Sequence, residues 1–502
     1  MNQQDKLQAS TSLGFAVTGL WFLHACLWTL LPWMASYSLP LDVVEGLFWG
    51  KEWQWGYYKH PPLPAWLVHL SWQLFADLGP FLLSQLNILL TAFFAWRLGQ
   101  RLLSTQQALL GTLLLMGVYY FTWPTLEYNH NVAQMPIWAA AIFFFHRGIT
   151  HWRYLDWFAL GVCVGLGLLT KYVIVVLVAT FFIYMLVQTP LRKRIFSGQV
   201  MLAILVLSLV FSPHLYWLVQ HDFLPLTYMQ DRANTTSALQ AHVVGPLKFI
   251  AVQLLDHVFI LLLLAAMGLL GRRYWSVKPE HEALRFLLWA GLGPALLTTL
   301  VAMMTGTGLR DMWGTPMWSV SGLLVAFFLP KSFTSAQASR ILKTFTVFIL
   351  VLPLLRLLDL AIIPYLKDKP SRIHWPDKAI AVELERAWEQ ETSCPLTLVV
   401  GDYWLAGLVS LRVPSRPSVL IEGQFRYSPW VTLDDVQQQG AVFVWRGGAA
   451  QAPNHEWMSA LAGLKHHTGQ VALEWPGIQA EPLQLSWIMM LPESGCYAFD
   501  DK

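Results

Sequence analysis

The chain has 502 residues, of which 55% are hydrophobic and 13% are charged. A soluble protein carries about 25% charged residues, so this composition excludes an ordinary cytosolic enzyme, a disordered protein and a nucleic-acid-binding protein. The net charge of +3 is too small to indicate a polyanionic partner, and four cysteines are too few for a disulfide scaffold. The 26 Trp, 28 Phe and 16 Tyr suit a protein with two membrane–water interfaces.

Charge-poor stretches recur along the first 365 residues. A helix needs roughly 20 residues to cross about 30 Å of hydrocarbon. Eleven stretches approach or reach this length: residues 14–33, 80–96, 108–121, 131–146, 157–169, 173–188, 200–219, 247–270, 286–304, 313–329 and 344–365. The sequence therefore predicts a mainly α, polytopic membrane protein of about 11 transmembrane helices.

Basic residues follow every even-numbered stretch. They are Arg97, Arg101, Arg147, Arg153, Arg192, Lys193, Arg194, Arg272, Arg273, Lys331, Arg340 and Lys343. Cytoplasmic loops carry an excess of Lys and Arg, so we expect these loops and the N-terminus to be cytoplasmic and the residues after 365 to lie outside. Residues 60–76 resemble a further span that would invert this pattern. We interpret them as an amphipathic helix in the outer interface, within the first outer loop.

From residue 366 onward the charge density rises and the apolar runs shorten to strand length. Strands are predicted at residues 396–400, 418–421, 442–445 and 471–474, and helices at 403–411 and 456–465. The sequence thus predicts a transmembrane domain over residues 1–365 and a small extracytoplasmic α/β domain over residues 366–502. Cys394 and Cys496 both fall in the second domain, where a disulfide can form.

The first outer loop gathers charges among aromatic residues. Its charged and titratable side chains are Asp42, Glu45, Lys51, Glu52, Lys59 and His60. One interpretation is an ordinary interfacial loop, in which the charges are solvated and Trp and Tyr anchor the loop. The other is a functional site that faces the outside.

This loop resembles that of the lipid-linked-sugar glycosyltransferases, a family of the C-type glycosyltransferase fold that includes protein O-mannosyltransferases and the lipid A aminoarabinose transferase. Asp42-Val43-Val44-Glu45 matches an acidic motif, Gly56-Tyr57-Tyr58 an aromatic stretch, and Lys59-His60-Pro61-Pro62 a basic residue before two prolines. Weaker matches are Thr170-Lys171, Arg310 ahead of Trp313-Gly314-Thr315-Pro316, and Ser212-Pro213-His214. The resemblance covers roughly residues 10–330.

The resemblance implies transfer of a sugar from a polyprenyl-phosphate donor to lipid A, a lipopolysaccharide core, another envelope glycan or a protein, at the outer face of a bacterial inner membrane with a periplasmic C-terminal domain. Glycoside hydrolases need a carboxylic acid to protonate the leaving group, whereas a phosphodiester leaves as a stable anion. The reaction needs a carboxylate to deprotonate the acceptor and cations to hold the phosphate. We expect Asp42 to be this base, Glu45 to share its helical face, and the anomeric carbon to invert.

The resemblance assigns other residues to the donor and the acceptor. Expected donor-phosphate contacts are Lys59, His60, Lys171 and Arg310, and expected acceptor or sugar contacts are Glu127, Asn129, Asn131, Tyr57 and Tyr58. Asn129 or Asn131 stands where the family has the Asp of a Pro-Asp motif, so the identity of a second acidic group stays open. Simpler roles are also open: Asn caps helices well, and Lys171 can snorkel to the interface.

The sequence contains no Asp-x-Asp motif and no His/Cys cluster at zinc spacing. We therefore expect no cofactor and no obligatory metal, although two outer acids could still hold a divalent ion. The expected partners are the lipid donor, the envelope acceptor and membrane lipid, with no nucleic acid.

Two other functions stay open. Asp256 and Arg356 lie within predicted spans and suit a transporter or flippase of lipid-linked sugars. Val43, where many family members have Glu, and the missing Pro-Asp motif suit a catalytically degenerate binding protein.

Overall fold

The computed structural model describes residues 3–233, 237–275, 282–453, 455–461, 463 and 465–493. The chain forms two compact units. Unit 1 comprises Met1–Leu31, Lys59–Pro64 and Phe81–Arg356, and unit 2 comprises Pro32–Tyr58, Ala65–Pro80 and Leu357–Lys502. Most of the first outer loop therefore folds with the C-terminal residues. The division of the chain into domains between residues 365 and 366 stays a prediction.

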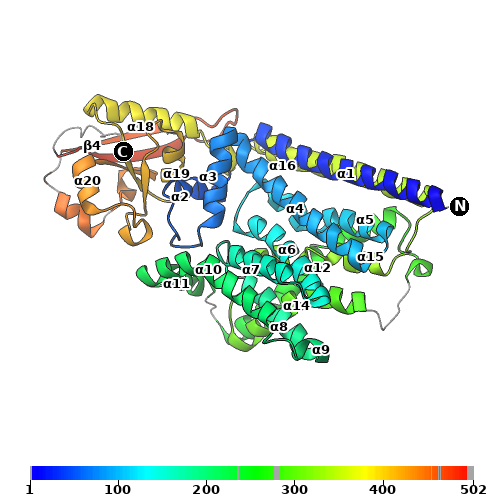
Figure 1. Ribbon diagram of the computed structural model, residues 1–502. Coiled ribbons are helices and arrows are strands. Elements are labelled where there is room, and N and C mark those ends of the chain that lie inside the picture. Colours follow the sequence, from blue (N-terminus) through cyan, green and yellow to red (C-terminus); the bar gives the residue numbers. More distant parts are fainter. Residues whose placement is uncertain are drawn as a thin grey trace. The chain divides into compact units, whose positions relative to one another are not determined.

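Unit 1 is built from helices (Figure 1). Its α-helices, some of which extend past its limits, are α1 (Gln3–Ala35), α4 (Gly79–Leu102), α5 (Thr105–Leu114), α6 (His130–His151), α7 (Tyr154–Leu168), α8 (Ile174–Val187), α9 (Thr189–Arg192), α10 (Gly198–Gln220), α11 (Leu224–Ala233), α12 (Gly245–Leu255), α13 (Val258–Ala266), α14 (Glu282–Thr305), α15 (Ser321–Phe327) and α16 (Ser335–Ala361). Short 3₁₀ or π segments are η2 (Leu115–Gly117), η3 (Tyr119–Phe121), η4 (Trp123–Leu126), η5 (Gln240–Val244), η6 (Arg272–Tyr274) and η7 (Asp311–Trp318).

The predicted count of about 11 transmembrane helices is not confirmed. Within the described residues, six helices are long and apolar enough to cross a membrane, or seven if the bent pair Thr105–Gly117 and Tyr119–Leu126 forms one span. Tyr154–Leu168 and Ile174–Val187 are apolar but shorter. The chain is thus a mainly helical, multi-pass membrane protein.

Three predicted spans are interrupted. Residues 108–121 and 313–329 are not among the six long helices, whereas residues 247–270 overlap the candidate span Gln240–Ala266 in spite of their break. Residues 108–121 become α5 and short 3₁₀ turns, with a bend of 89°. Residues 247–270 become α12 and α13, which are separated at Asp256 and His257, and residues 313–329 become η7 and α15. A search for charge-free stretches detects apolar composition, but it does not detect where such a helix breaks.

The non-helical backbone that follows α5 is hydrogen-bonded by its neighbours. The Tyr119 N–H donates to the carbonyl of Asp256 at 2.8 Å, and the Ser84 hydroxyl donates to the carbonyl of Thr125 at 2.5 Å. Irregular backbone is stable at membrane depth only where the protein satisfies its polar groups. α4 and the α12–α13 break supply these partners.

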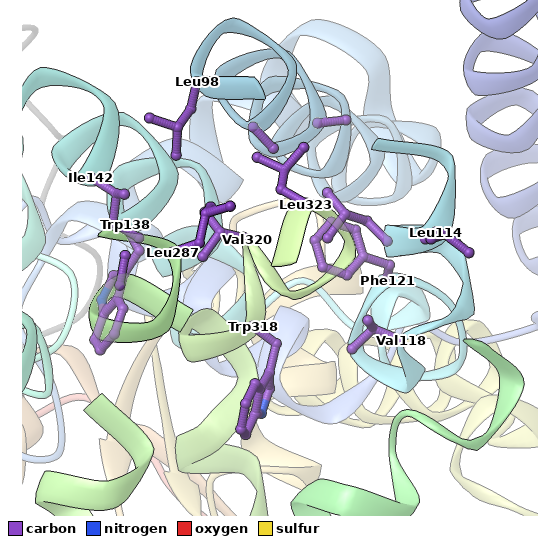
Figure 2. Close-up of a cluster of buried hydrophobic side chains, with 14 of the residues drawn as sticks. Leu98, Leu114, Val118, Phe121, Trp138, Ile142, Leu287, Trp318, Val320 and Leu323 are labelled. Carbon is purple, nitrogen blue, oxygen red and sulfur yellow. The ribbon is translucent and has the colours of Figure 1, made fainter. Parts of the chain in front are cut away.

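The apolar core of unit 1 surrounds the same segment. Figure 2 shows Leu114, Val118 and Phe121 of the interrupted span among buried side chains from other helices. These other side chains are Leu98 of α4, Trp138 and Ile142 of α6, Leu287 of α14, Trp318 of η7, and Val320 and Leu323 at α15. The break is therefore enclosed by packing.

Unit 2 combines helices with one sheet. Its helices are α2 (Leu41–Lys51), α3 (Leu63–Phe75), η1 (Ala76–Leu78), α17 (Ile363–Leu366), η8 (Arg372–His374), α18 (Asp377–Glu391), α19 (Leu405–Arg412), η9 (Phe425–Tyr427), α20 (Leu433–Gln439), η10 (Ala449–Gln451) and η11 (Glu456–Leu461). Its strands are β1 (Leu398–Gly401), β2 (Ser418–Ile421), β3 (Ala441–Arg446), β4 (His466–Leu473) and β5 (Leu483–Met490).

The sheet has five strands in the order β2-β1-β3-β5-β4. β2, β1 and β3 are parallel, with Leu398 opposite Ser418 and Val399 opposite Val442. β3, β5 and β4 are antiparallel. α19 connects β1 to β2, and the crossover between parallel strands is usually an α-helix.

The predicted small α/β composition of the C-terminal residues is confirmed, with local differences. The strand at 418–421 has the predicted limits, whereas 471–474 lies at the end of the longer β4. Residues 456–461 form a 3₁₀ helix, and part of the predicted helix beyond them lies outside the described residues. Cys394 is disulfide-bonded, while its expected partner Cys496 lies outside the described residues.

An ion cluster within unit 2 joins the first outer loop to the C-terminal helices. Arg412 of α19 lies 2.7 Å from Asp377 of α18 and 2.8 Å from Asp77 of η1, and its side chain is 10% exposed. Both carboxylates depend on this one guanidinium. Removing one partner of a buried ion pair is costly because the remaining charge stays buried.

We expect Arg412→Met to destabilise unit 2 by about 3 kcal/mol, since Asp77 and Asp377 lose their cation. Arg386→Met is the matched control, because Arg386 is 59% exposed in a pair with Glu383, and exposed pairs contribute under about 1 kcal/mol. Thermal unfolding of the full chain in detergent, together with limited proteolysis, measures the difference. Equal stability of the two variants would contradict the role of the cluster.

Candidate functional site

Asp42 lies in the first turn of α2, in unit 2. The helix begins directly after Pro40, whose carbonyl accepts a hydrogen bond from the Val44 N–H at 3.0 Å. The N-terminus of a helix carries a partial positive charge that stabilises a nearby carboxylate. Because Asp42 is only half-buried, its carboxylate keeps access to solvent.

The remainder of α2 is packed against α19. A Cβ at Gly407 would lie 2.8 Å from Cγ1 of Val44 and 3.0 Å from Cδ1 of Phe48, so glycine permits the close approach of the two helices. Glu45, one turn after Asp42, is 6% exposed. The position of Asp42 is therefore set by packing within unit 2.

Tyr57 and Tyr58 are buried in aromatic contacts of unit 2. The Tyr57 ring stacks on Trp49 at 5.0 Å, and its hydroxyl donates to the Trp49 carbonyl at 2.7 Å. Tyr58 stacks on Tyr427 at 4.4 Å. Both tyrosines therefore hold the end of α2 and the η9 turn in place, and their expected contact with an acceptor stays a prediction.

Lys51 and Glu52 at the end of α2 are not ordinary solvated charges. The Lys51 ammonium donates to the carbonyl of Arg416 and lies 3.7 Å from Glu52, and the Ser418 hydroxyl donates to Glu52 at 2.8 Å. Burial lowers the pKa of Lys51 and raises the pKa of Glu52. This part of the loop is integrated into the fold rather than lying loosely at an interface.

In unit 1, several residues that we expect to contact the sugar donor or the sugar acceptor lie close together. The rings of His60 and His130 are 4.0 Å apart, and the Leu63 N–H donates to the Leu169 carbonyl at 3.0 Å. The Lys171 ammonium donates to Oδ1 of Asn131 at 2.5 Å. The Lys59–Pro64 segment, the start of α6 and the α7–α8 turn therefore form one polar cluster, which we call the cationic cluster.

The two asparagines of the cluster have different roles. Asn129 is the N-cap of α6, and its side chain accepts from the N–H groups of Asn131 and Val132 at 2.9 and 3.2 Å. Asn131 holds Lys171. The helix-cap alternative is thus seen at Asn129, whereas Asn131 orients a cation. Glu127, two residues before Asn129, is half-buried at the end of η4, and the identity of a second acidic group stays a prediction.

Lys171 is also positioned through its neighbour Tyr172. The Tyr172 hydroxyl lies 2.7 Å from Nε2 of His214, which is fully buried in α10. Gln134 of α6 donates to the Lys171 carbonyl at 2.7 Å. The Thr170-Lys171 and Ser212-Pro213-His214 motifs, far apart in the sequence, therefore meet at one turn. The Lys59 ammonium lies 5.8 Å from the Tyr228 ring.

Arg310 is placed by a hydrogen-bond hub in unit 1 that the sequence analysis missed. Gln253 of α12 donates to the Asp311 carbonyl at 3.1 Å and accepts from Nε1 of Trp318 at 2.8 Å. A Cβ at Gly314 would lie 1.9 Å from Oε1 of Gln253. The only signal for this hub in the sequence is a glutamine inside an apolar stretch. The Arg310 side chain itself is exposed.

The charged residues within predicted spans lie at identifiable places in unit 1. Asp256 lies at the break between α12 and α13, and the guanidinium of Arg356 lies over the Trp123 ring at 4.6 Å. The described residues contain no group of three or more His, Cys, Asp or Glu that could hold a metal ion. The expectation of a reaction without a metal stays a prediction.

Sequence comparison reveals relatives among enzymes. The family model for dolichyl-phosphate-mannose-protein mannosyltransferase matches residues 59–217. The lipopolysaccharide core galacturonosyltransferase RgtB of Rhizobium johnstonii is 25% identical over 456 residues, which is 85% of this chain and 87% of RgtB. The lipid A galacturonosyltransferase RgtD of the same organism is 26% identical over 297 residues, or 58% of this chain and 60% of RgtD.

Structure comparison points the same way. ArnT from Cupriavidus metallidurans in the apo state has a TM-score of 0.58 at 13% identity, over 94% of this chain and 98% of ArnT. The same protein bound to undecaprenyl phosphate has a TM-score of 0.55 at 12% identity, over 97% and 98%. These likenesses show the fold. Together with the named relatives, they confirm the resemblance to lipid-linked-sugar glycosyltransferases: the chain is a membrane glycosyltransferase with the C-type fold.

Proposed function

We propose that this enzyme transfers a sugar from a polyprenyl-phosphate donor to lipid A or the lipopolysaccharide core, at the outer face of a bacterial inner membrane. The observation that carries the proposal is the similarity to a lipopolysaccharide core galacturonosyltransferase over 85% of the chain. The structural likeness to an enzyme with bound undecaprenyl phosphate supports the donor class. The proposed orientation has a cytoplasmic N-terminus and a periplasmic C-terminal domain.

In the proposed mechanism, the Asp42 carboxylate takes the proton of an acceptor hydroxyl. The resulting oxygen nucleophile attacks the anomeric carbon of the donor, and the bond from that carbon to the phosphate oxygen breaks. Polyprenyl phosphate leaves with the electron pair. One displacement inverts the anomeric centre. Glu45, on the turn that follows Asp42, orients Asp42 in this scheme.

Phosphate contact is assigned to the basic residues Lys59, His60, Lys171 and Arg310. Lys171 is the best supported, because its ammonium is fixed by Asn131 at 2.5 Å and its turn is fixed through Tyr172 and His214. A preorganised cation stabilises the developing charge of the leaving phosphate without the cost of reorienting during the reaction. His60 contributes a ring N–H as a hydrogen-bond donor.

The function is tested with purified full-length enzyme in nanodiscs, a polyprenyl-phosphate galacturonate donor carrying a radiolabel in the sugar, and lipid A or core acceptors. We expect label in an acceptor, with the anomeric configuration opposite to that of the donor by NMR. Folded enzyme that moves donor across the bilayer of proteoliposomes without labelling any acceptor would instead support the flippase alternative. Retention at the anomeric carbon would exclude a single displacement.

We expect Asp42→Asn to lower the transfer rate by about 10²–10⁴-fold, because general-base catalysis contributes this much. Donor binding should be unchanged, since the amide leaves the cations in place. Asp368→Asn is a matched control: Asp368 is also an acid of unit 2, it is exposed, and its φ of 47° is one that Asn tolerates. The initial rate and donor affinity are measured for both variants. Full turnover by Asp42→Asn would remove Asp42 as the base.

We expect Lys171→Met to weaken donor binding by about tenfold or more, since a hydrogen bond to a charged group contributes about 1.5–3 kcal/mol. The measurement is displacement of labelled donor by undecaprenyl phosphate at several salt concentrations. Lys343→Met, which removes an exposed lysine of α16, should bind like the parent. A Lys171→Met variant with unchanged affinity and unchanged rate would contradict phosphate contact by this residue.

A further inference from the structure

Unit 2 contains a cavity of 520 Å³ that has no role in the proposed mechanism. Its size lies within the range of about 300–1,000 Å³ that is typical of small-molecule sites. The lining residues are Leu41, Pro370, Ser371, Arg372, Trp375, Asp402, Tyr403, Trp404, Arg446 and Trp475. They come from the start of α2, the segment before α18, the β1–α19 connection, the end of β3 and the β4–β5 connection, so the cavity is built by the tertiary fold.

Three tryptophans give the cavity aromatic walls. Trp375 makes edge contacts with both Trp404 and Trp475, at ring distances of 5.7 and 5.9 Å and interplanar angles of 81° and 83°. This packing holds the rings rigidly. Tryptophan combines a large apolar surface with one polar N–H, and the C–H faces of a sugar ring pack well against such surfaces.

One polar group in this wall lacks a partner. The indole Nε1 of Trp404 is buried and has no hydrogen-bond partner within the described part of the chain. Trp404 as a whole is 7% exposed. The corresponding nitrogen of Trp475 donates to the Glu481 carbonyl at 2.9 Å. A buried donor without a partner costs free energy, and Trp404 is one of the residues that line the cavity.

The charged lining residues favour an anion. Arg372 and Arg446 are both exposed and approach the cavity from different elements. Asp402 is the single acid of the lining, and its Oδ1 already accepts from the N–H groups of Trp404 and Leu405 at 2.9 and 3.0 Å. Two guanidinium groups against one carboxylate leave a net positive charge, and arginine binds phosphate and carboxylate groups in a bidentate manner.

The cavity lies beside the proposed base within unit 2. Leu41, which contributes to the lining, is the first residue of α2 and directly precedes Asp42. A ligand held by the tryptophans and arginines would therefore place its neighbouring groups near the N-terminus of α2.

We propose that this cavity binds the acceptor glycan, through a sugar that carries a phosphate or carboxylate group. The assignment of the ligand as the acceptor rests on the proposed function, whereas binding of an anionic sugar does not depend on it. The tryptophans contact the sugar ring, the arginines bind the anionic group, and Nε1 of Trp404 donates to a ring or hydroxyl oxygen.

Calorimetric titration of the full-length enzyme in detergent tests the site with four probes. These are a glucosamine disaccharide bisphosphate, the same disaccharide without phosphates, digalacturonate, and inorganic phosphate. We expect at least one of the two anionic disaccharides to bind about tenfold or more tightly than both the neutral disaccharide and inorganic phosphate, since charge-assisted hydrogen bonds contribute this much. Comparison of the two anionic probes tells phosphate from carboxylate as the recognised group.

Variants connect binding to the cavity. The double variant Arg372→Gln, Arg446→Gln should lower the affinity for the preferred anionic disaccharide by about tenfold or more. Trp404→Phe should lower the affinity for the neutral and the preferred anionic disaccharide alike, so that the preference for the anion remains. Arg386→Gln, which changes an exposed arginine of unit 2 outside the lining, should bind like the parent. Binding is measured without donor, so loss of transfer and loss of binding are separable. The proposal would be overturned if the double variant bound every probe like the parent. It would also be overturned if the parent bound the neutral disaccharide as tightly as both anionic disaccharides.

Discussion

The close approach of α2 and α19 at Gly407 is the constraint on which the first outer loop depends. A methyl group at position 407 would lie only 2.8 Å from the Val44 side chain, so the two helices can pack this tightly only because this residue has no side chain. The Arg412 cluster, the Trp49–Tyr57 stack and the bonds of Lys51 and Glu52 secure the same loop. As a result, a carboxylate near the start of the chain takes its position from residues of the C-terminal domain.

Unit 1 holds the cation of Lys171 in a fixed position beside apolar helices. Lys171 lies in the short turn between α7 and α8, where a lysine would otherwise snorkel freely. Asn131 fixes its ammonium group, Gln134 fixes its carbonyl, and the Tyr172–His214 contact fixes the turn from the opposite side. Because each of these polar groups finds a partner inside the protein, the turn avoids the cost of unsatisfied groups in an apolar environment.

Much of the helical composition, the C-terminal sheet and the family could be predicted from the sequence, because apolar stretches, short strand-length runs and the motifs around Asp42 and Lys59 are local signals. The breaks at Asp256 and after α5 could not be predicted, since they depend on hydrogen-bond partners such as Ser84 that lie elsewhere in the sequence. Gln253 was missed for the same reason. The aromatic wall around Trp375 could not be predicted either, because Trp404 and Trp475 contact Trp375 only in the folded domain.

In the proposed mechanism the two units supply different groups, because Asp42 lies in unit 2 and the cationic cluster lies in unit 1. One of the points at which the chain passes between the units is between Tyr58 and Lys59. The mannosyltransferase family model begins at residue 59 and ends at residue 217, so it includes the cationic cluster but neither Asp42 nor the tryptophan-lined cavity. The relatives named for that family and for lipopolysaccharide differ in sugar and in acceptor. In the proposed function, the cationic cluster within this segment binds the lipid phosphate of the donor. In the same proposal, selection of the acceptor falls to the aromatic cavity of unit 2, whose lining includes Leu41, the residue before Asp42.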